Sequence, residues 1–300
     1  MADASIPVDL HNPGQVFACL GFLEAAEILH GNAEGGFDWS EPTEVSFVLC
    51  ANSERNPIEA VLSRIVTAEL TELLPTDWPG KLLDNAIEAD EFPSPMVEHY
   101  VKQDKKWSTT KLPLVFTVDD GTSFRMSHWT DGSSRAPFKL YSGNRSACSI
   151  ARGMLFGKSD NSANGVKQLV ANDIESLTED PFNQTCPIGG SFNFDPRGGW
   201  TQIDAGFSIN RHDHINVVSS PVVEILAAIG LEHSRPGTVE AKDETKSELQ
   251  RYAAWNGLIP LTLARAAISG ANVGIPARCF RYRFAASGKN KVNTFSTEEI

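Results

Sequence analysis

The sequence lacks several features that would assign a location or a class at once. It has no run of about 18 apolar residues, so we expect no membrane-spanning helix. Its five cysteines are widely spaced without a Cys-x-x-Cys pair, which argues against a disulfide framework or a zinc site and favours a reducing compartment. The first residues, MADASIPVDL, contain neither a basic nor an apolar segment, so we expect no signal peptide and a cytoplasmic location.

Signatures of catalysis are also missing. Neither G-x-x-x-x-G-K-S/T nor G-x-G-x-x-G occurs, so no phosphate-binding loop is predicted. No G-x-S-x-G elbow is present, and no cysteine has a nearby histidine in a nucleophile pattern. We therefore predict a non-catalytic protein without a cofactor.

One compact group of potential metal ligands keeps an alternative open. His212 and His214 flank Asp213, and side chains two residues apart point the same way on a strand. Imidazole is a frequent ligand of zinc and iron, but no spacing identifies the further ligands that a metal site needs. The alternative is a metal-dependent nuclease that uses His212, Asp213 and His214.

The charge of the chain is divided unevenly along its length. Taken over the whole chain, the net charge of −12 argues against a polyanion as a partner. Residues 1–100, however, hold 18 acidic and 3 basic residues, a net charge of −15, whereas residues 101–300 hold 20 acidic and 23 basic residues, a net charge of +3. Such asymmetry is typical of chains in which one region faces a polyanion and the other faces solvent or a basic partner.

Cap and turn residues divide the chain into expected elements. Asn12-Pro13-Gly14-Gln15 predicts a helix start, because Asn and Gln satisfy free backbone donors there and Pro loses no hydrogen bond. Ser220-Pro221 opens a second apolar helix, and Asp119-Asp120-Gly121-Thr122 predicts the turn of a hairpin. We also expect strands at 5–10, 44–51 and 277–285, helices at 57–74 and 146–157, and extended or looped structure at 171–202.

These elements favour the α+β class, because a strand–helix–strand start is followed by a hairpin and then by mixed helices and strands. We expect one domain spanning residues 1–300, with an irregular insertion at 75–111 and an exposed charged loop at 237–250.

Six basic residues are the candidates for phosphate contact. Lys139 and Arg145 flank a flexible turn whose amides can approach a phosphate, and Arg152 lies near the end of the helix expected at 146–157. Arg278, Arg281 and Arg283 are interleaved with three aromatic residues, a composition suited to backbone contact and base stacking. Alternation along a strand places Arg281 and Arg283 opposite the aromatic side chains.

Four segments together resemble CRISPR-associated effector proteins of the Csb/Csx group, from subtype I-G (formerly I-U) loci. They are NPGQVFACLGFLEAAEIL (12–29), FKLYSGNRSACSIARGM (138–154), GWTQIDAGFSIN (199–210) and SSPVVEILAAIGLEHSRP (219–236). The resemblance implies a RAMP-like protein with an RRM-like (ferredoxin-like) core that carries helical and loop insertions. A glycine-rich loop near the end of the chain, typical of RAMP proteins, is not evident.

The resemblance further implies a non-catalytic subunit of a type I CRISPR RNA-guided surveillance (Cascade-type) complex in antiviral defence. Its partners would be other effector subunits and guide RNA, with target DNA as a further candidate, and no membrane. In such ribonucleoprotein complexes base pairing reads the sequence, while the protein holds the backbone. A third hypothesis is a protein-only adaptor that recruits other effector subunits through the acidic surface of residues 1–100.

Overall fold

The computed structural model describes most of the chain, apart from several internal segments. The described residues are 1–41, 43–74, 86–88, 102–103, 106–107, 110, 112–129, 138–141, 145–160, 162–199, 218–239, 249–287 and 290–299.

The fold is α+β, as predicted, and its described strands form three four-stranded sheets and three strand pairs. The first sheet has the order β1 (Ala2–Pro7), β3 (Ser46–Ala51), β2 (Glu34–Asp38), β14 (Ile259–Pro260). The second has the order β12 (Gly237–Val239), β13 (Leu249–Trp255), β15 (Ala277–Tyr282), β18 (Thr297–Glu298). The third has the order β5 (Ala86–Glu88), β4 (Glu69–Leu74), β8 (Leu114–Thr117), β9 (Ser123–Met126). All pairings in these sheets are antiparallel except that of β4 with β5.

The remaining elements are short pairs and helices. The strand pairs are β6 (Lys102–Gln103) with β7 (Lys106–Trp107), β10 (Cys186–Pro187) with β11 (Val218–Ser219), and β16 (Phe284–Ser287) with β17 (Asn290–Asn293). The helices are α1 (Pro13–His30), α2 (Pro57–Ile65), α4 (Ala147–Phe156), α5 (Val166–Asn172), α6 (Ile174–Glu179), the 3₁₀ turn η2 (Pro196–Gly198), α8 (Pro221–Gly230) and α9 (Leu261–Ala267).

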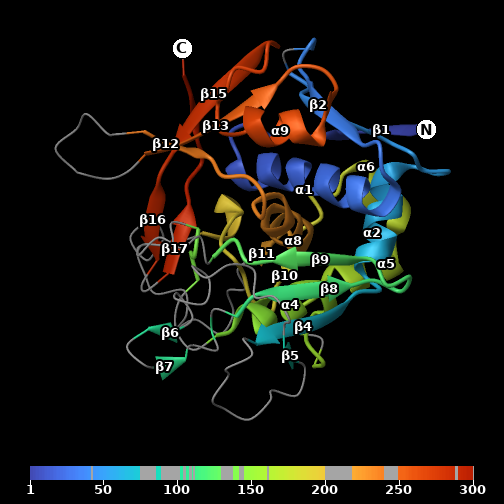
Figure 1. Ribbon diagram of the computed structural model, residues 1–300, viewed down its shortest axis with the longest axis vertical. Coiled ribbons are helices and arrows are strands. Elements are labelled where there is room, and N and C mark those ends of the chain that lie inside the picture. The colour runs from blue at the N-terminus through green and yellow to red at the C-terminus, as the bar shows by residue number, and fades with distance from the viewer. Residues whose placement is uncertain are drawn as a thin grey trace.

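Helices α1 and α8 form the centre of the molecule, with β13 and β15 on one side and β8 and β9 on the other (Figure 1). Their backbones approach closely because glycines line the contact. A Cβ atom on Gly21 would lie 1.9 Å from the carbonyl oxygen of Leu226, and one on Gly230 would lie 2.3 Å from that of Phe17. Any larger residue at Gly21 or Gly230 must therefore push the helices apart.

The predicted start of α1 is confirmed, with one difference in its cap. The side chain of Asn12 accepts a hydrogen bond from the Gln15 N–H at 3.2 Å, as expected. The side chain of Gln15 instead accepts from the backbone N–H of Asp9 at 2.7 Å, one turn further out than a capping box would place it. Every residue from Pro13 to Ala26 is buried, so the helix packs on all sides.

Two expectations at the level of elements are wrong, and one strand was missed. The helix expected at 57–74 ends at Ile65, and Glu69–Leu74 is strand β4, because its backbone pairs with β8. Strand β2 was not expected, since Gly35 and Gly36 weaken an isolated strand and become ordered only beside β3. The looped structure expected at 171–202 contains helix α6, which Asp173 caps through the N–H of Ser176.

Other expectations hold in part or fall outside the described residues. The hairpin at Asp119–Thr122 is confirmed by the pairing of β8 with β9. The insertion predicted at 75–111 contains β5, β6 and β7, and its remaining residues lie almost entirely outside the described part of the chain. The loop predicted at 237–250 begins as β12 and ends in β13, whereas residues 240–248 lie outside that part. Within the described residues, no helix has the length and apolar character needed to cross a membrane.

Candidate nucleic-acid interface

The six predicted phosphate contacts do not form one surface. Arg278 and Arg281 lie on β15, near one end of the long axis of the molecule, whereas Arg152 lies on α4 towards the other end (Figure 1). Strand pairing instead places Arg281 opposite an arginine that the sequence did not single out, Arg251 on β13. Arg278 lies on the other face of the same sheet and is joined to these two through the neighbouring residues Glu298 and Glu299. We call Arg251, Arg278 and Arg281 the arginine cluster.

The register of β13 and β15 builds the cluster. Arg251 lies directly opposite Arg281, and Tyr252 lies opposite Phe280. Because side chains alternate along a strand, the buried rings of Tyr252 and Phe280 point into the core, while Arg251 and Arg281 lie on the other face. Arg278 is on the same face as Phe280, at the rim of the core.

Glu298 on strand β18 and Glu299, the residue after it, supply carboxylates to all three arginines. Arg278 donates two hydrogen bonds to Glu298, from Nε to Oε1 and from Nη2 to Oε2, both at 2.6 Å. Arg251 Nε donates to the two oxygens of Glu299 at 3.1 and 3.0 Å, and Arg281 Nε donates to Oε1 of the same carboxylate. Two carboxylates therefore compensate two of the three positive charges of the cluster.

These contacts keep both carboxylates ionised. The hydrogen bond from Arg278 is the largest cause that holds the pKa of Glu298 below its usual range. Partial burial raises the pKa of Glu299, but hydrogen bonds from Arg281 and Arg251 and the charges of these arginines outweigh burial and lower it. Because the side chains are 17–49% exposed, each ion pair contributes on the order of 0.2–1 kcal/mol. These ion pairs therefore stabilise the docking of residues 298 and 299 on the sheet only modestly.

Aromatic rings and a pocket adjoin the cluster. The guanidinium of Arg278 lies 5.6 Å from the ring centroids of both Trp39 and Phe280, within the range of cation–π attraction. The ring of His11 meets Phe280 edge to face at 5.3 Å. Arg278 and His11 line a pocket of about 830 Å³, together with the backbone and side chains of residues 5–10 and 43–46. The surroundings thus combine fixed positive charge, aromatic faces and open space.

The other four predicted residues have local partners. Lys139 donates from Nζ to the carbonyl oxygen of Tyr141 at 2.8 Å, and Arg145 donates from Nη1 to that of Gly189 at 3.3 Å. Arg152 is exposed and lines a pocket of about 490 Å³ beside β4 and β5. Arg283 lies between β15 and β16, and its backbone N–H donates to Oγ1 of Thr294 at 3.1 Å. None of these four contacts β18 through an ion pair given by the described residues.

Sequence reasoning missed Arg251, Trp39 and the two glutamates of the 297–299 segment. A signal for Arg251 is present, because the dipeptide Arg-Tyr occurs at 251–252 and again at 281–282. Two strands with the same alternation of charged and aromatic residues are natural partners in an antiparallel sheet. Expecting an exposed loop up to residue 250 hid this match.

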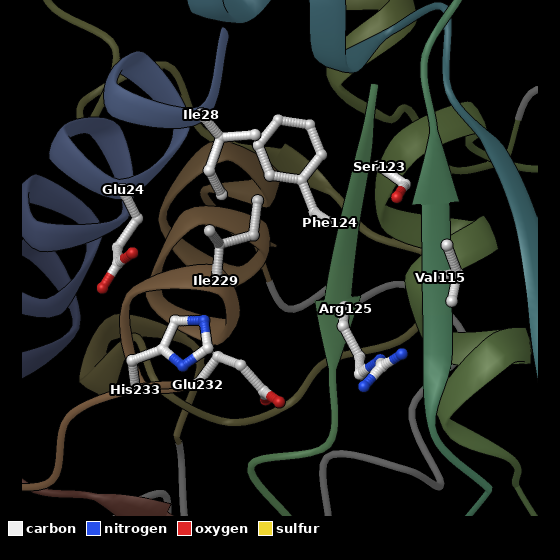
Figure 2. A pocket seen from close by; sticks show the side chains of 9 residues that line it. All are labelled: Glu24, Ile28, Val115, Ser123, Phe124, Arg125, Ile229, Glu232 and His233. Carbon is white, nitrogen blue, oxygen red and sulfur yellow. The ribbon is translucent and has the colours of Figure 1, made fainter. Parts of the chain in front are cut away.

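A second pocket, of about 330 Å³, lies between α1, α8, β8 and β9 (Figure 2). Ile28 and Phe124 gather at one end, while His233 and Glu232 lie at the other. Glu232 accepts hydrogen bonds from the N–H and hydroxyl of Ser127, at 2.5 and 2.7 Å. Because the carboxylates of Glu24 and Glu232 line this pocket, it suits an anionic ligand less than the arginine cluster does.

The metal alternative lies outside the described residues, since His212, Asp213 and His214 all belong to the segment 200–217. Among the residues that the structure does describe, no group of three His, Cys, Asp or Glu side chains is placed to hold a metal ion.

Comparisons of the chain with protein-family models, with curated proteins and with solved structures found no match.

Proposed function

We propose that the protein is a non-catalytic subunit of a type I CRISPR RNA-guided surveillance complex, related to the Csb/Csx group of subtype I-G. In this role it binds guide RNA and target DNA through their backbones and assembles with the other effector subunits. The observation that supports this most is the arginine cluster on paired strands, beside Trp39 and the open pocket at Arg278. Guanidinium groups bind phosphates in a forked geometry, and aromatic faces stack on unpaired bases.

The order of elements at the start of the chain supports an RRM-like core. A ferredoxin-like motif follows the pattern β-α-β-β-α-β. Here β1, α1, β2, β3 and α2 follow the first five elements, with β3 between β1 and β2 and with α1 and α2 both in contact with β3. The sixth element, β4, pairs with β8 in another sheet, so the proposed core is an incomplete version of the motif.

Charge reversal at Arg281 tests the interface, because this side chain is the most exposed of the cluster at 49%. We expect Arg281→Glu to weaken binding of single-stranded RNA about three- to tenfold. It should also flatten the plot of log K against log salt by about 0.7, the value for one lost phosphate contact on a single strand. Arg55→Glu is the matched control, since Arg55 is exposed and pairs only locally with Glu59. Equal affinities and slopes for the two variants would contradict the assignment.

Copurification with the products of neighbouring genes, with and without nuclease treatment, tests membership of a complex. Loss of the partners after RNA digestion supports assembly on guide RNA. Partners that stay bound indicate direct protein contact and favour the adaptor role of the acidic region 1–100. Metal analysis of the purified protein addresses the nuclease alternative, which requires stoichiometric metal and cleavage dependent on Mn²⁺ or Mg²⁺.

A further inference from the structure

Glu298 and Glu299 form ion pairs with arginines on both faces of the sheet that contains β15. Glu298 and Glu299 are neighbours in an extended segment, so their side chains point to opposite sides of the sheet. Glu298 pairs with Arg278 on one side, and Glu299 pairs with Arg251 and Arg281 on the other. Two carboxylates thus engage three guanidinium groups, and one end of the sheet that would otherwise attract anions is covered.

The covering segment is short and lies at the edge of its sheet. It pairs with β15 only at Thr297 and Glu298, and a further hydrogen bond of 2.8 Å runs from the N–H of Glu299 to the carbonyl oxygen of Cys279. Thr297 is exposed, and neither glutamate is fully buried. Detachment of residues 297–299 therefore exposes little apolar surface.

The residue before this segment is held far more firmly. Ser296 is buried, its N–H donates to the carbonyl oxygen of His11 at 2.8 Å, and its hydroxyl lies 2.6 Å from the hydroxyl of Tyr252. His11 Nδ1 also lies 3.0 Å from the Ser296 carbonyl oxygen. Ser296 is thus a fixed point from which residues 297–299 can swing without disturbing the core.

Carboxylate and phosphate oxygens suit the same forked guanidinium geometry. We infer that the arginine cluster is a binding site for the phosphate backbone of single-stranded nucleic acid, and that Glu298 and Glu299 occupy this site in the free protein. The inference rests on the proposed function and adds a regulation to it: the nucleic acid binds by displacing residues 297–299. A single strand fits best, because the pocket of about 830 Å³ beside Arg278 and His11 can receive an unpaired base next to the phosphate site.

The test compares the wild type with the double variant Glu298→Gln/Glu299→Gln in fluorescence anisotropy titrations of a fluorescein-labelled single-stranded oligouridylate. Neutral amides bind the arginines less strongly and add no repulsion to phosphate, so we expect the double variant to bind about tenfold more tightly. Its plot of log K against log salt should run parallel to that of the wild type, because the complexes of both proteins make the same arginine–phosphate contacts and only the competing carboxylates are lost. Glu59→Gln is the control, since it removes one exposed ion pair elsewhere on the surface.

Hydrogen exchange gives a second readout on the wild-type chain. The amide of Glu299 is protected only while β18 remains docked on Cys279. We expect saturating oligouridylate to abolish this protection, while the Ser296 amide keeps its own.

Each outcome is decisive. If the wild type binds RNA, but the double variant binds no more tightly and Glu299 stays protected, the covering role is wrong and the proposed function stands. If neither protein binds RNA, both are wrong. If the double variant binds an RNA-free effector subunit more tightly than the wild type does, but binds RNA no more tightly, the cluster is a protein interface and the inference is overturned.

Discussion

The buried carboxyl group of Glu224 makes the stability of the protein depend on pH in a defined direction. Glu224 lies in the first turn of α8 and has no exposed surface. Its Oε1 accepts a hydrogen bond from the N–H of Asp195 at 2.9 Å, and Asp195, also buried, forms an ion pair of 2.7 Å with Arg197. Burial is the main cause that raises the pKa of Glu224 from 4.5 to about 7, and the charge of Asp195 adds to it against opposing hydrogen bonds.

The sign and size of the effect follow from this pKa. The folded protein keeps a proton on Glu224 up to about pH 7, whereas the unfolded chain releases it near pH 4.5. Between these values unfolding releases a proton, so the contribution of Glu224 to the free energy of unfolding falls as pH rises, and it is constant above pH 7. At 1.36 kcal/mol per unit of pKa, the total loss is about 3 kcal/mol.

Urea unfolding of the wild type and of Glu224→Gln at pH 5 and pH 8 measures this contribution. A glutamine keeps the acceptor for the Asp195 N–H but carries no titrating proton, so the difference between the two proteins isolates Glu224 from all other carboxyl groups. We expect Glu224→Gln to gain about 2–3 kcal/mol relative to the wild type between pH 5 and pH 8. A difference that is the same at both pH values would refute the reasoning. Glu59→Gln, at a half-buried position on α2, is the control for a Glu-to-Gln substitution elsewhere in the protein.

Two further predictions concern packing and a buried ion pair. Gly21→Ala should destabilise the protein by about 3 kcal/mol, because the new methyl group meets the carbonyl of Leu226. Gly153→Ala is the control and should destabilise far less, since a Cβ atom there has its nearest contact at 3.3 Å. Thermal melting of the two variants compares their stabilities. Arg265→Met should lower the free energy of unfolding, measured in urea, by about 3 kcal/mol, because it leaves the buried carboxylate of Glu24 without its hydrogen bonds of 2.6 and 2.7 Å. The double variant Arg265→Met/Glu24→Gln should recover much of that loss. No recovery in the double variant would show that the arginine stabilises chiefly through packing.

The sequence allowed good prediction of elements whose ends are marked by local chemistry. The caps at Asn12 and Ser220 locate the starts of α1 and α8, and Ser146 caps α4 through the N–H of Ser149. Helix α2 and strand β4 could not be separated in this way, because apolar residues continue at helical spacing across Ile65. Only the pairing of β4 with β8, more than 40 residues further on, decides that Glu69–Leu74 is a strand.

The sequence predicts some of the residues of the candidate interface but not where in the fold they come together. Arg278 and Arg281 were found through their alternation with aromatic residues. The approach of Arg281 to Arg251 depends on strand register, and the ion pairs of the cluster depend on the docking of the edge strand β18 and of Glu299 beside it. Neither is encoded in a local pattern, since the partners are separated by about 20 to 50 residues and the intervening chain forms a helix and other strands.

The glycine-lined contact of α1 with α8 also has a consequence for synthesis. About 190 residues separate the two helices, so the contacts between them have a large sequence separation. At 5–20 residues per second, the ribosome needs roughly 10–40 seconds to synthesise α8 after α1. During that interval the most apolar helix of the first half has no partner along its glycine face. Helix α1, in which Pro13 to Ala26 are all buried in the folded protein, is therefore among the first elements to be made and is enclosed only after α8 has been made. The nascent chain is accordingly a natural client for a chaperone.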